Sequence, residues 1–184
     1  MNRKQHATIL RNARKIHRIM GIFLFAFFLV ISLTGLLLGW KKNIDYLQTP
    51  TQKGVAKDVS AWLPMDTLIA NANLALEKKW GRKLSTEIDK LDARPDKGII
   101  KVIYKNHYNS LQIDAATGEV LSYESRTSDF IEQLHDGSYI DDLFGLPGGI
   151  FKLFYTALLG LALTAFAVTG FWLWYGPKVM RKLS

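Results

Sequence analysis

The sequence predicts an α-helical two-pass membrane protein with a small α+β domain between its two spans. Two apolar runs, from Ile19 to Trp40 and from Leu153 to Tyr175, contain no charged residue. A helix needs about 20 apolar residues to cross the hydrocarbon core of a bilayer, and both runs reach that length. Between them, residues 41–152 show the patterns of one amphipathic helix and several short strands.

The distribution of charge orients the predicted spans, because Lys and Arg close to a span stay on the cytoplasmic side. Residues 1–18 and 176–184 are basic tails without Asp or Glu, whereas residues 41–152 hold all 16 acidic residues. The net charge of +8 therefore comes from the tails, which we expect to bind anionic membrane lipids and no nucleic acid. Both termini are expected to be cytoplasmic and residues 41–152 periplasmic, in the bacterial inner membrane.

The first predicted span, residues 19–40, is expected to remain as an uncleaved anchor. It is longer than the apolar region of a secretory signal, and Trp40 is followed by two lysines instead of a small-residue cleavage site. The second span is predicted at residues 153–175. The chain contains no cysteine, which excludes thiol chemistry and Cys-ligated iron–sulfur or zinc sites.

Within the domain, residues 41–63 are expected to form an irregular tether, and a helix is predicted to follow from Pro64 to about Gly81. Proline suits a first helical position and glycine suits a C-terminal cap. Apolar residues recur on one face of this helix at steps of three and four. They are Met65, Ile69, Ala72, Leu76 and Trp80.

An antiparallel sheet of three or four strands is predicted after this helix. Apolar residues alternate near residues 85–93, 100–104, 111–113 and 120–123, with turn residues between them. Gly118 supplies the positive φ that the turn after Asp114 requires. A last amphipathic helix is predicted near residues 128–136, on the membrane surface.

Several short motifs occur in a fixed order along the chain. They are Arg14-Lys15-Ile16-His17-Arg18-Ile19-Met20-Gly21, Leu33-Thr34-Gly35, Ile113-Asp114-Ala115-Ala116-Thr117-Gly118-Glu119-Val120, Leu134-His135-Asp136-Gly137 and Val168-Thr169-Gly170. In this order they resemble the PepSY-associated transmembrane family over nearly the whole chain. The resemblance implies a PepSY-like domain at residues 41–152. Larger members of the family include haem-b membrane reductases that release iron from siderophores, and this chain resembles a half-size version of them.

His17 is the first candidate ligand of a haem b iron. It stands at the predicted cytoplasmic end of the first span, and Gly21 follows one helical turn further on the same face. A porphyrin bound edge-on to a helix needs a ligating imidazole beside a turn without a side chain, which Gly21 provides. An interfacial histidine among lipid headgroups, with Gly21 serving helix packing, remains the alternative.

His135 is the second candidate iron ligand, and a capped or solvent-facing histidine is its alternative interpretation. A six-coordinate haem needs two axial ligands, but the cytoplasmic end of the second span contains no histidine. The missing ligand is therefore expected from a homodimer, in which each histidine faces its own copy, or from a related membrane subunit.

Two hypotheses for the function follow. The spans lack the buried charges of ion transporters, and the outer residues show no Gly-rich phosphate loop, no H-E-x-x-H and no nucleophile with an evident base. The leading hypothesis is a haem-b transmembrane electron-transfer protein that reduces a periplasmic acceptor such as a ferric siderophore. Only this hypothesis would make the chain an enzyme, namely a haem-dependent ferric or siderophore reductase. The alternative is a non-redox, membrane-anchored PepSY module that binds or regulates a periplasmic peptidase or envelope partner.

Overall fold

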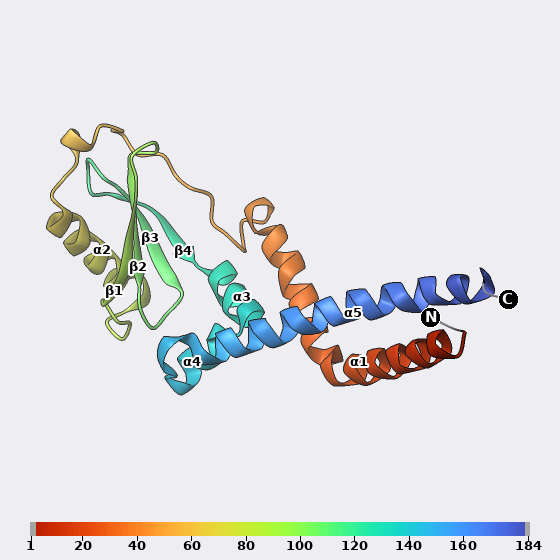
Figure 1. Cartoon of the computed structure of the whole chain (residues 1–184). Helices are drawn as coiled ribbons and strands as arrows, with labels where there is room; N and C mark the ends of the chain where they lie inside the picture. The colour runs from red at the N-terminus through yellow and green to blue at the C-terminus, as the bar shows by residue number, and fades with distance from the viewer. Residues whose placement is uncertain (1–2, 183–184) are drawn as a thin grey trace. The chain divides into compact units, whose positions relative to one another are not determined.

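The computed structural model describes residues 3–182, so the outermost residues of the two basic tails, 1–2 and 183–184, lie outside the described part (Figure 1). The chain forms two compact units. One contains the residues up to 36 and those from 132 onward, and the other contains residues 37–131.

Two long helices, α1 (Arg3–Gly39) and α5 (Ile150–Lys182), contain the two predicted spans, except that Trp40 lies just past the end of α1. The stretches Lys4–Gly39 and Pro147–Lys182 are long and apolar enough to cross a membrane, and each has 36 residues. At 1.5 Å per residue this is about 54 Å, which exceeds the roughly 30 Å of a hydrocarbon core. Only 6% and 11% of the residues in their most apolar segments are buried inside the protein, as contact with lipid requires.

Residues 37–131 contain a four-stranded antiparallel sheet with α2 (Met65–Trp80) on one face (Figure 1). The strands follow one another in space as in sequence, in the order β1-β2-β3-β4. They are β1 (Ile88–Arg94), β2 (Ile99–Tyr104), β3 (Asn109–Asp114) and β4 (Val120–Ser125). The predicted fold, one helix on an antiparallel meander, is confirmed.

The apolar core lies between α2 and the sheet. Its fully buried members are Leu68, Ala72, Leu76, Ile100, Val102, Tyr104, Leu111, Ile113 and Ala115. The prediction that Met65 lies on this face was wrong, because Met65 is 43% exposed. Leu68 is buried instead, and it lies one and two turns before Ala72 and Leu76 on the same side of the helix.

The turn after β3 is held by the carboxylate of Asp114. Its oxygens accept the backbone N–H groups of Val55, Ala116 and Thr117 at 2.7, 2.8 and 3.0 Å. Burial acts to raise the pKa of Asp114, but these backbone hydrogen bonds outweigh it and leave the pKa below its usual value of 3.8. Gly118 has φ of 75°, as predicted.

Residues 47–56, which we call the strap, run along the sheet on the side away from α2. The Gln112 side chain accepts the N–H of Gln52 at 2.8 Å and donates to the carbonyl of Pro50 at 3.0 Å. Leu47 at the start of the strap is 5% exposed. The prediction that residues 41–63 form a tether was therefore wrong for the strap, which packs on the sheet. In the described structure this stretch is otherwise irregular, with two short helical turns, η1 (Lys41–Asn43) and η2 (Val59–Ala61).

Two short helices precede α5. They are α3 (Thr127–Asp136) and α4 (Ser138–Phe144), and they meet at Gly137, whose φ is 83°. After η3 (Pro147–Gly149), the carboxylate of Asp141 accepts the N–H groups of Phe151 and Lys152, both at 2.9 Å. Asp141 is 5% exposed, so it caps the first turn of α5 from inside the protein.

Candidate functional site

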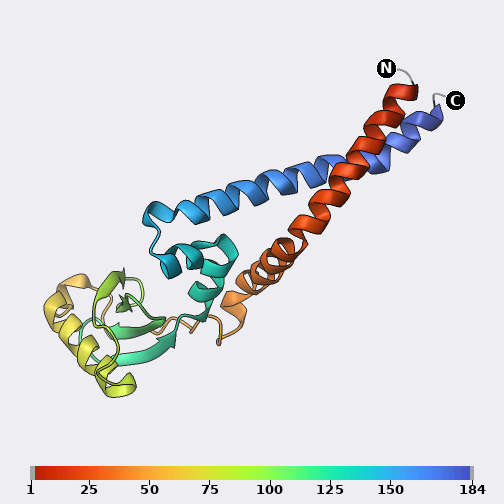
Figure 2. The ribbon, with the colours of Figure 1, turned by 90° about the horizontal axis from the view of Figure 1, so that it is seen from below.

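His17 contacts α5 through a threonine hydroxyl. Its Nδ1 lies 2.8 Å from Oγ1 of Thr169, although the two residues are 152 positions apart in sequence. The ring of Phe166 meets the His17 ring edge-on, with centroids 4.7 Å apart. α1 and α5 are neighbours at this level, and Figure 2 shows them side by side toward the two termini.

The hydrogen bonds of Thr169 favour the tautomer of His17 with its proton on Nδ1. The single hydroxyl hydrogen of Thr169 is donated to the carbonyl of Ala165, at 2.6 Å. With the Thr169 hydrogen assigned to that carbonyl, the hydroxyl accepts its second hydrogen bond from Nδ1–H of His17. In the neutral imidazole, Nε2 then has the free lone pair, which is the arrangement that metal-ligating histidines adopt.

His135 repeats this arrangement on a different pair of elements. Its Nδ1, on α3, lies 2.9 Å from Oγ1 of Thr34 on α1. Oγ1 of Thr34 is 2.7 Å from the carbonyl of Val30, and with its hydroxyl hydrogen assigned to that carbonyl, His135 also donates from Nδ1. Thr34 is only 8% exposed, which shields this hydrogen bond from competing solvent.

A glycine follows each of these two threonines and faces the same histidine ring. A Cβ atom on Gly35 would lie 3.3 Å from Cε1 of His135, closer than most Cβ contacts, and one on Gly170 would lie 3.7 Å from Cε1 of His17. The Thr-Gly pair thus supplies a hydroxyl and a flat surface at each site. Within residues 3–182, no protein group is hydrogen-bonded to Nε2 of His17 or of His135.

A cavity of about 480 Å³ opens beside His17. Its lining is mostly apolar or aromatic, with one guanidinium. The lining residues are His17, Arg18, Gly21, Ile22, Phe25 and Phe166. Gly21 thus lies in the same cavity as His17, where a Cβ would reach only ordinary contact distance, 3.7 Å, from the Phe166 ring.

The other two histidines are placed differently. His107 uses both ring nitrogens, Nε2 with the carbonyl of Ser85 at 2.9 Å and Nδ1 with the N–H of Asn109 at 3.2 Å. His6 stacks on Trp172 with centroids 6.1 Å apart. Among the described residues, no cluster of three His, Cys, Asp or Glu side chains is suited to a metal ion.

The acidic residues after His135 stabilise the local structure. Asp136 pairs with Lys152 at 2.5 Å and accepts from Ser138, Asp141 caps α5, and Asp142 accepts from Gln133 at 2.8 Å. Burial acts to raise the pKa of Asp136, but its hydrogen bonds with Lys152 and Ser138 outweigh this and lower the pKa.

Sequence reasoning proposed both histidines as ligands, which stays a prediction, and missed the threonines to which they are hydrogen-bonded. Thr34 and Thr169 were noted only as parts of motifs. The signal that could have found them is the Thr-Gly dipeptide, which occurs once in each apolar run. Gly39, which spacing pairs with Gly35, has no atom within 4 Å of its ideal Cβ position.

Comparison with known proteins gives one result. A family model described as the PepSY-associated TM region matches residues 14–181, which include both histidines and both Thr-Gly pairs. No curated protein and no solved structure matches the chain. The match agrees with the two apolar helices and the α+β domain described above. The chain is therefore a membrane protein that belongs to the PepSY-associated TM region family.

Proposed function

We propose that this chain is a haem-b-binding transmembrane electron-transfer protein, in which Nε2 of His17 and Nε2 of His135 each bind a haem iron. The observation that supports this most directly is the bonding of Nδ1. With each threonine hydrogen assigned to a helix carbonyl, both imidazoles donate from Nδ1 and keep Nε2 for a ligand.

The surroundings of His17 fit the group chemically. Phe25 and Phe166 offer apolar surface to a porphyrin face, and Arg18 offers a guanidinium for a propionate carboxylate. At the second site, Gly35 lets the His135 ring pack closely against α1. Haem iron, when bound, supplies one-electron chemistry, while the chain contributes axial ligands, apolar surroundings and charge.

The second axial ligand of each haem is proposed to come from another copy of the chain. His17 and His135 contact different threonines on different helices and share no partner. In a symmetric dimer His17 would face its own copy, and His135 would do the same at the other site. A related membrane subunit that donates the second histidine is the other way to complete the sites.

The proposed direction of electron transfer follows from the basic tails. If these tails are cytoplasmic, as the distribution of Lys and Arg indicates, residues 41–152 are periplasmic and His135 belongs to the outer site. Electrons would enter near His17 and leave near His135 to a ferric siderophore or a protein acceptor. The bacterial inner membrane is the proposed location.

The test is an absorbance spectrum of the chain purified in mild detergent from haem-sufficient cells, before and after dithionite. We expect the sharp reduced bands of low-spin haem b, near one haem per chain. His17→Ala and His135→Ala should each remove about half of the haem, whereas His107→Ala, whose ring is engaged within the domain, should remove none. A wild-type preparation that stays colourless after added haem would refute the proposal.

The alternative function is a non-redox PepSY module that binds or regulates a periplasmic peptidase or envelope partner. The strap and the polar side chains beneath it favour this function, since they form a second packed layer on the sheet that membrane anchoring does not require. A module of this kind should keep its function in the His17→Ala/His135→Ala double variant.

A further inference from the structure

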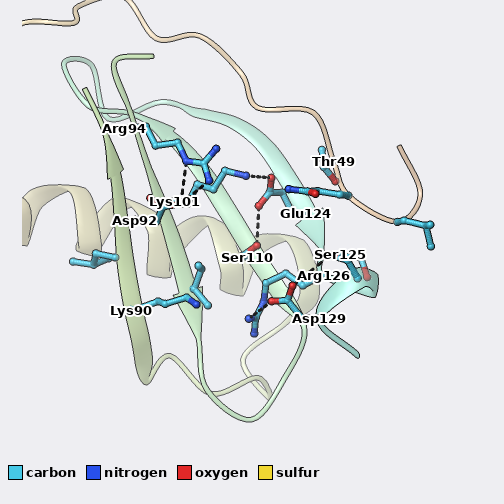
Figure 3. Close-up of a pocket in the computed structure, with 15 residues that line it drawn as sticks. Thr49, Lys90, Asp92, Arg94, Lys101, Ser110, Glu124, Ser125, Arg126 and Asp129 are labelled. Atoms are coloured by element: carbon cyan, nitrogen blue, oxygen red, sulfur yellow. Dashed lines mark hydrogen bonds and ion pairs between the residues drawn. The ribbon is translucent and has the colours of Figure 1, made fainter. Parts of the chain in front are cut away.

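The sheet face away from α2 contains a cavity of about 420 Å³, which is within the usual range for small-molecule sites. Lys101, Ser110 and Glu124 lie on its floor, and Figure 3 shows them projecting from β2, β3 and β4 toward one another. Leu47, Gln48 and Thr49 of the strap form part of its wall.

The centre of this floor is a buried ion pair. Nζ of Lys101 lies 2.8 Å from Oε1 of Glu124, and both side chains are 8% exposed. Glu124 also accepts from Oγ of Ser110 at 3.0 Å and from the Gln112 amide. The Glu124 carboxylate is therefore well supplied with donors.

Lys101 is not satisfied in the same way. An ammonium group has three N–H donors, and within residues 3–182 Lys101 has one acceptor, Glu124. Two donors of this buried charge have no acceptor in that part of the chain, and Lys101 lines the cavity, where a polar partner could fill its hydrogen-bonding capacity.

The remaining charges around the cavity leave an excess of positive charge. Arg94 is bonded to Asp92 at 2.8 Å, and Arg126 to Asp129 at 2.9 Å. Lys101 is paired with Glu124. Of the basic residues that line the cavity, the exposed Lys90 alone forms no ion pair with a carboxylate in the described part of the chain. The cavity therefore favours a ligand with a negative charge.

We propose that this cavity binds the carboxylate of a small ligand, with the free N–H groups of Lys101 as its principal donors and Lys90 as a supporting cation at the rim. The apolar side chains of Leu47 and Ile103 line the same cavity and suit a short aliphatic body. A peptide C-terminus and a small organic acid offer the same carboxylate. This proposal does not depend on haem.

The test is a titration of the full chain, ¹⁵N-labelled in detergent micelles, followed by the amide signals of Ser110 and Glu124. The probes are trialanine, trialanine amide and citrate. We expect saturable shifts of both signals with trialanine or with citrate, and at least tenfold weaker binding of the amide. Binding of trialanine but not citrate would identify a peptide C-terminus as the source of the carboxylate. Binding of citrate but not trialanine would identify a small organic acid.

Variants assign the effect to the cavity. Lys101→Met/Glu124→Gln removes both buried charges together, so it leaves no unpaired carboxylate, and it should weaken carboxylate binding at least tenfold. Lys105→Met is the matched control, because Lys105 pairs with Glu87 outside the cavity. Absence of saturable shifts with both carboxylate probes would overturn the proposal, as would unchanged binding in a double variant with a native-like spectrum.

Discussion

Replacing Thr169 with alanine should weaken the proposed haem binding at His17 without removing the ligand itself. The hydroxyl of Thr169 is the partner that keeps the hydrogen on Nδ1 of His17, at 2.8 Å. Without it, the imidazole is free to rotate and to adopt the other tautomer, in which Nε2 carries the hydrogen and is not a ligand.

The expected size of the effect follows from the orienting role of the Thr169 hydroxyl. Removal of the group that orients a ligating histidine typically costs 10- to 100-fold in metal affinity, roughly 1.4–2.8 kcal/mol. Thr169→Ser keeps the hydroxyl and should stay near wild type. The reduction potential of that haem should also shift in Thr169→Ala, since the hydrogen bond affects the basicity of the imidazole.

Thr164 provides the matched control on the same helix. Its hydroxyl donates to the carbonyl of Gly160 at 2.9 Å, as that of Thr169 does to Ala165, but Thr164 is exposed and contacts no histidine. Haem titration of the apo chain, with redox potentiometry of the loaded chain, compares the two variants. Equal haem affinity and equal potential in Thr169→Ala and Thr164→Ala would refute the reasoning.

Three further predictions concern stability. Asp141→Ala should lower the free energy of unfolding by about 2–3 kcal/mol, because it removes the acceptor of two N–H groups at the start of α5. Asp142 is exposed, so Asp142→Ala should cost much less. Thermal unfolding in detergent, followed by circular dichroism, compares the two variants. Lys101→Met should lower the free energy of unfolding by about 3–5 kcal/mol, because it leaves Glu124 buried and unpaired. Lys101→Met/Glu124→Leu should recover most of that stability in urea unfolding. Equal destabilisation in both variants would contradict this. Since the pKa of Asp114 is lowered in the folded chain, its contribution is present above about pH 4 and is lost as pH falls through the folded pKa. The melting temperature of Asp114→Asn should therefore fall less steeply than that of wild type between about pH 5 and pH 2, and parallel curves would count against this role of Asp114.

Local patterns predicted much of the fold. The absence of charge identified both long apolar helices, and alternation with turn residues identified the meander, including the positive φ of Gly118. These features depend on short-range sterics and periodicity, so a window of sequence contains the information. The first position of the buried face of α2 was assigned to Met65 instead of Leu68, because both residues are apolar and only packing distinguishes them.

The long-range contacts were not predictable in this way. The strap was missed because its pairing with Gln112 joins a polar side chain to backbone groups 60 residues away, without any repeating pattern. The partners of His17 and His135 were missed for a similar reason. They lie 152 and 101 positions away, and finding them requires the rotation of each helix about its axis.

The two threonine–histidine contacts have a mechanical consequence for α1. His17 of this helix is hydrogen-bonded to Thr169 of α5, and Thr34 of this helix is hydrogen-bonded to His135 of α3. The rotation of α1 about its axis is therefore specified at two points along its length. Adding or removing one residue between them would turn one point relative to the other by about 100°. Apart from the cavity residues Gly21, Ile22 and Phe25, the segment between His17 and Thr34 should therefore tolerate changes of side chain far better than changes of length.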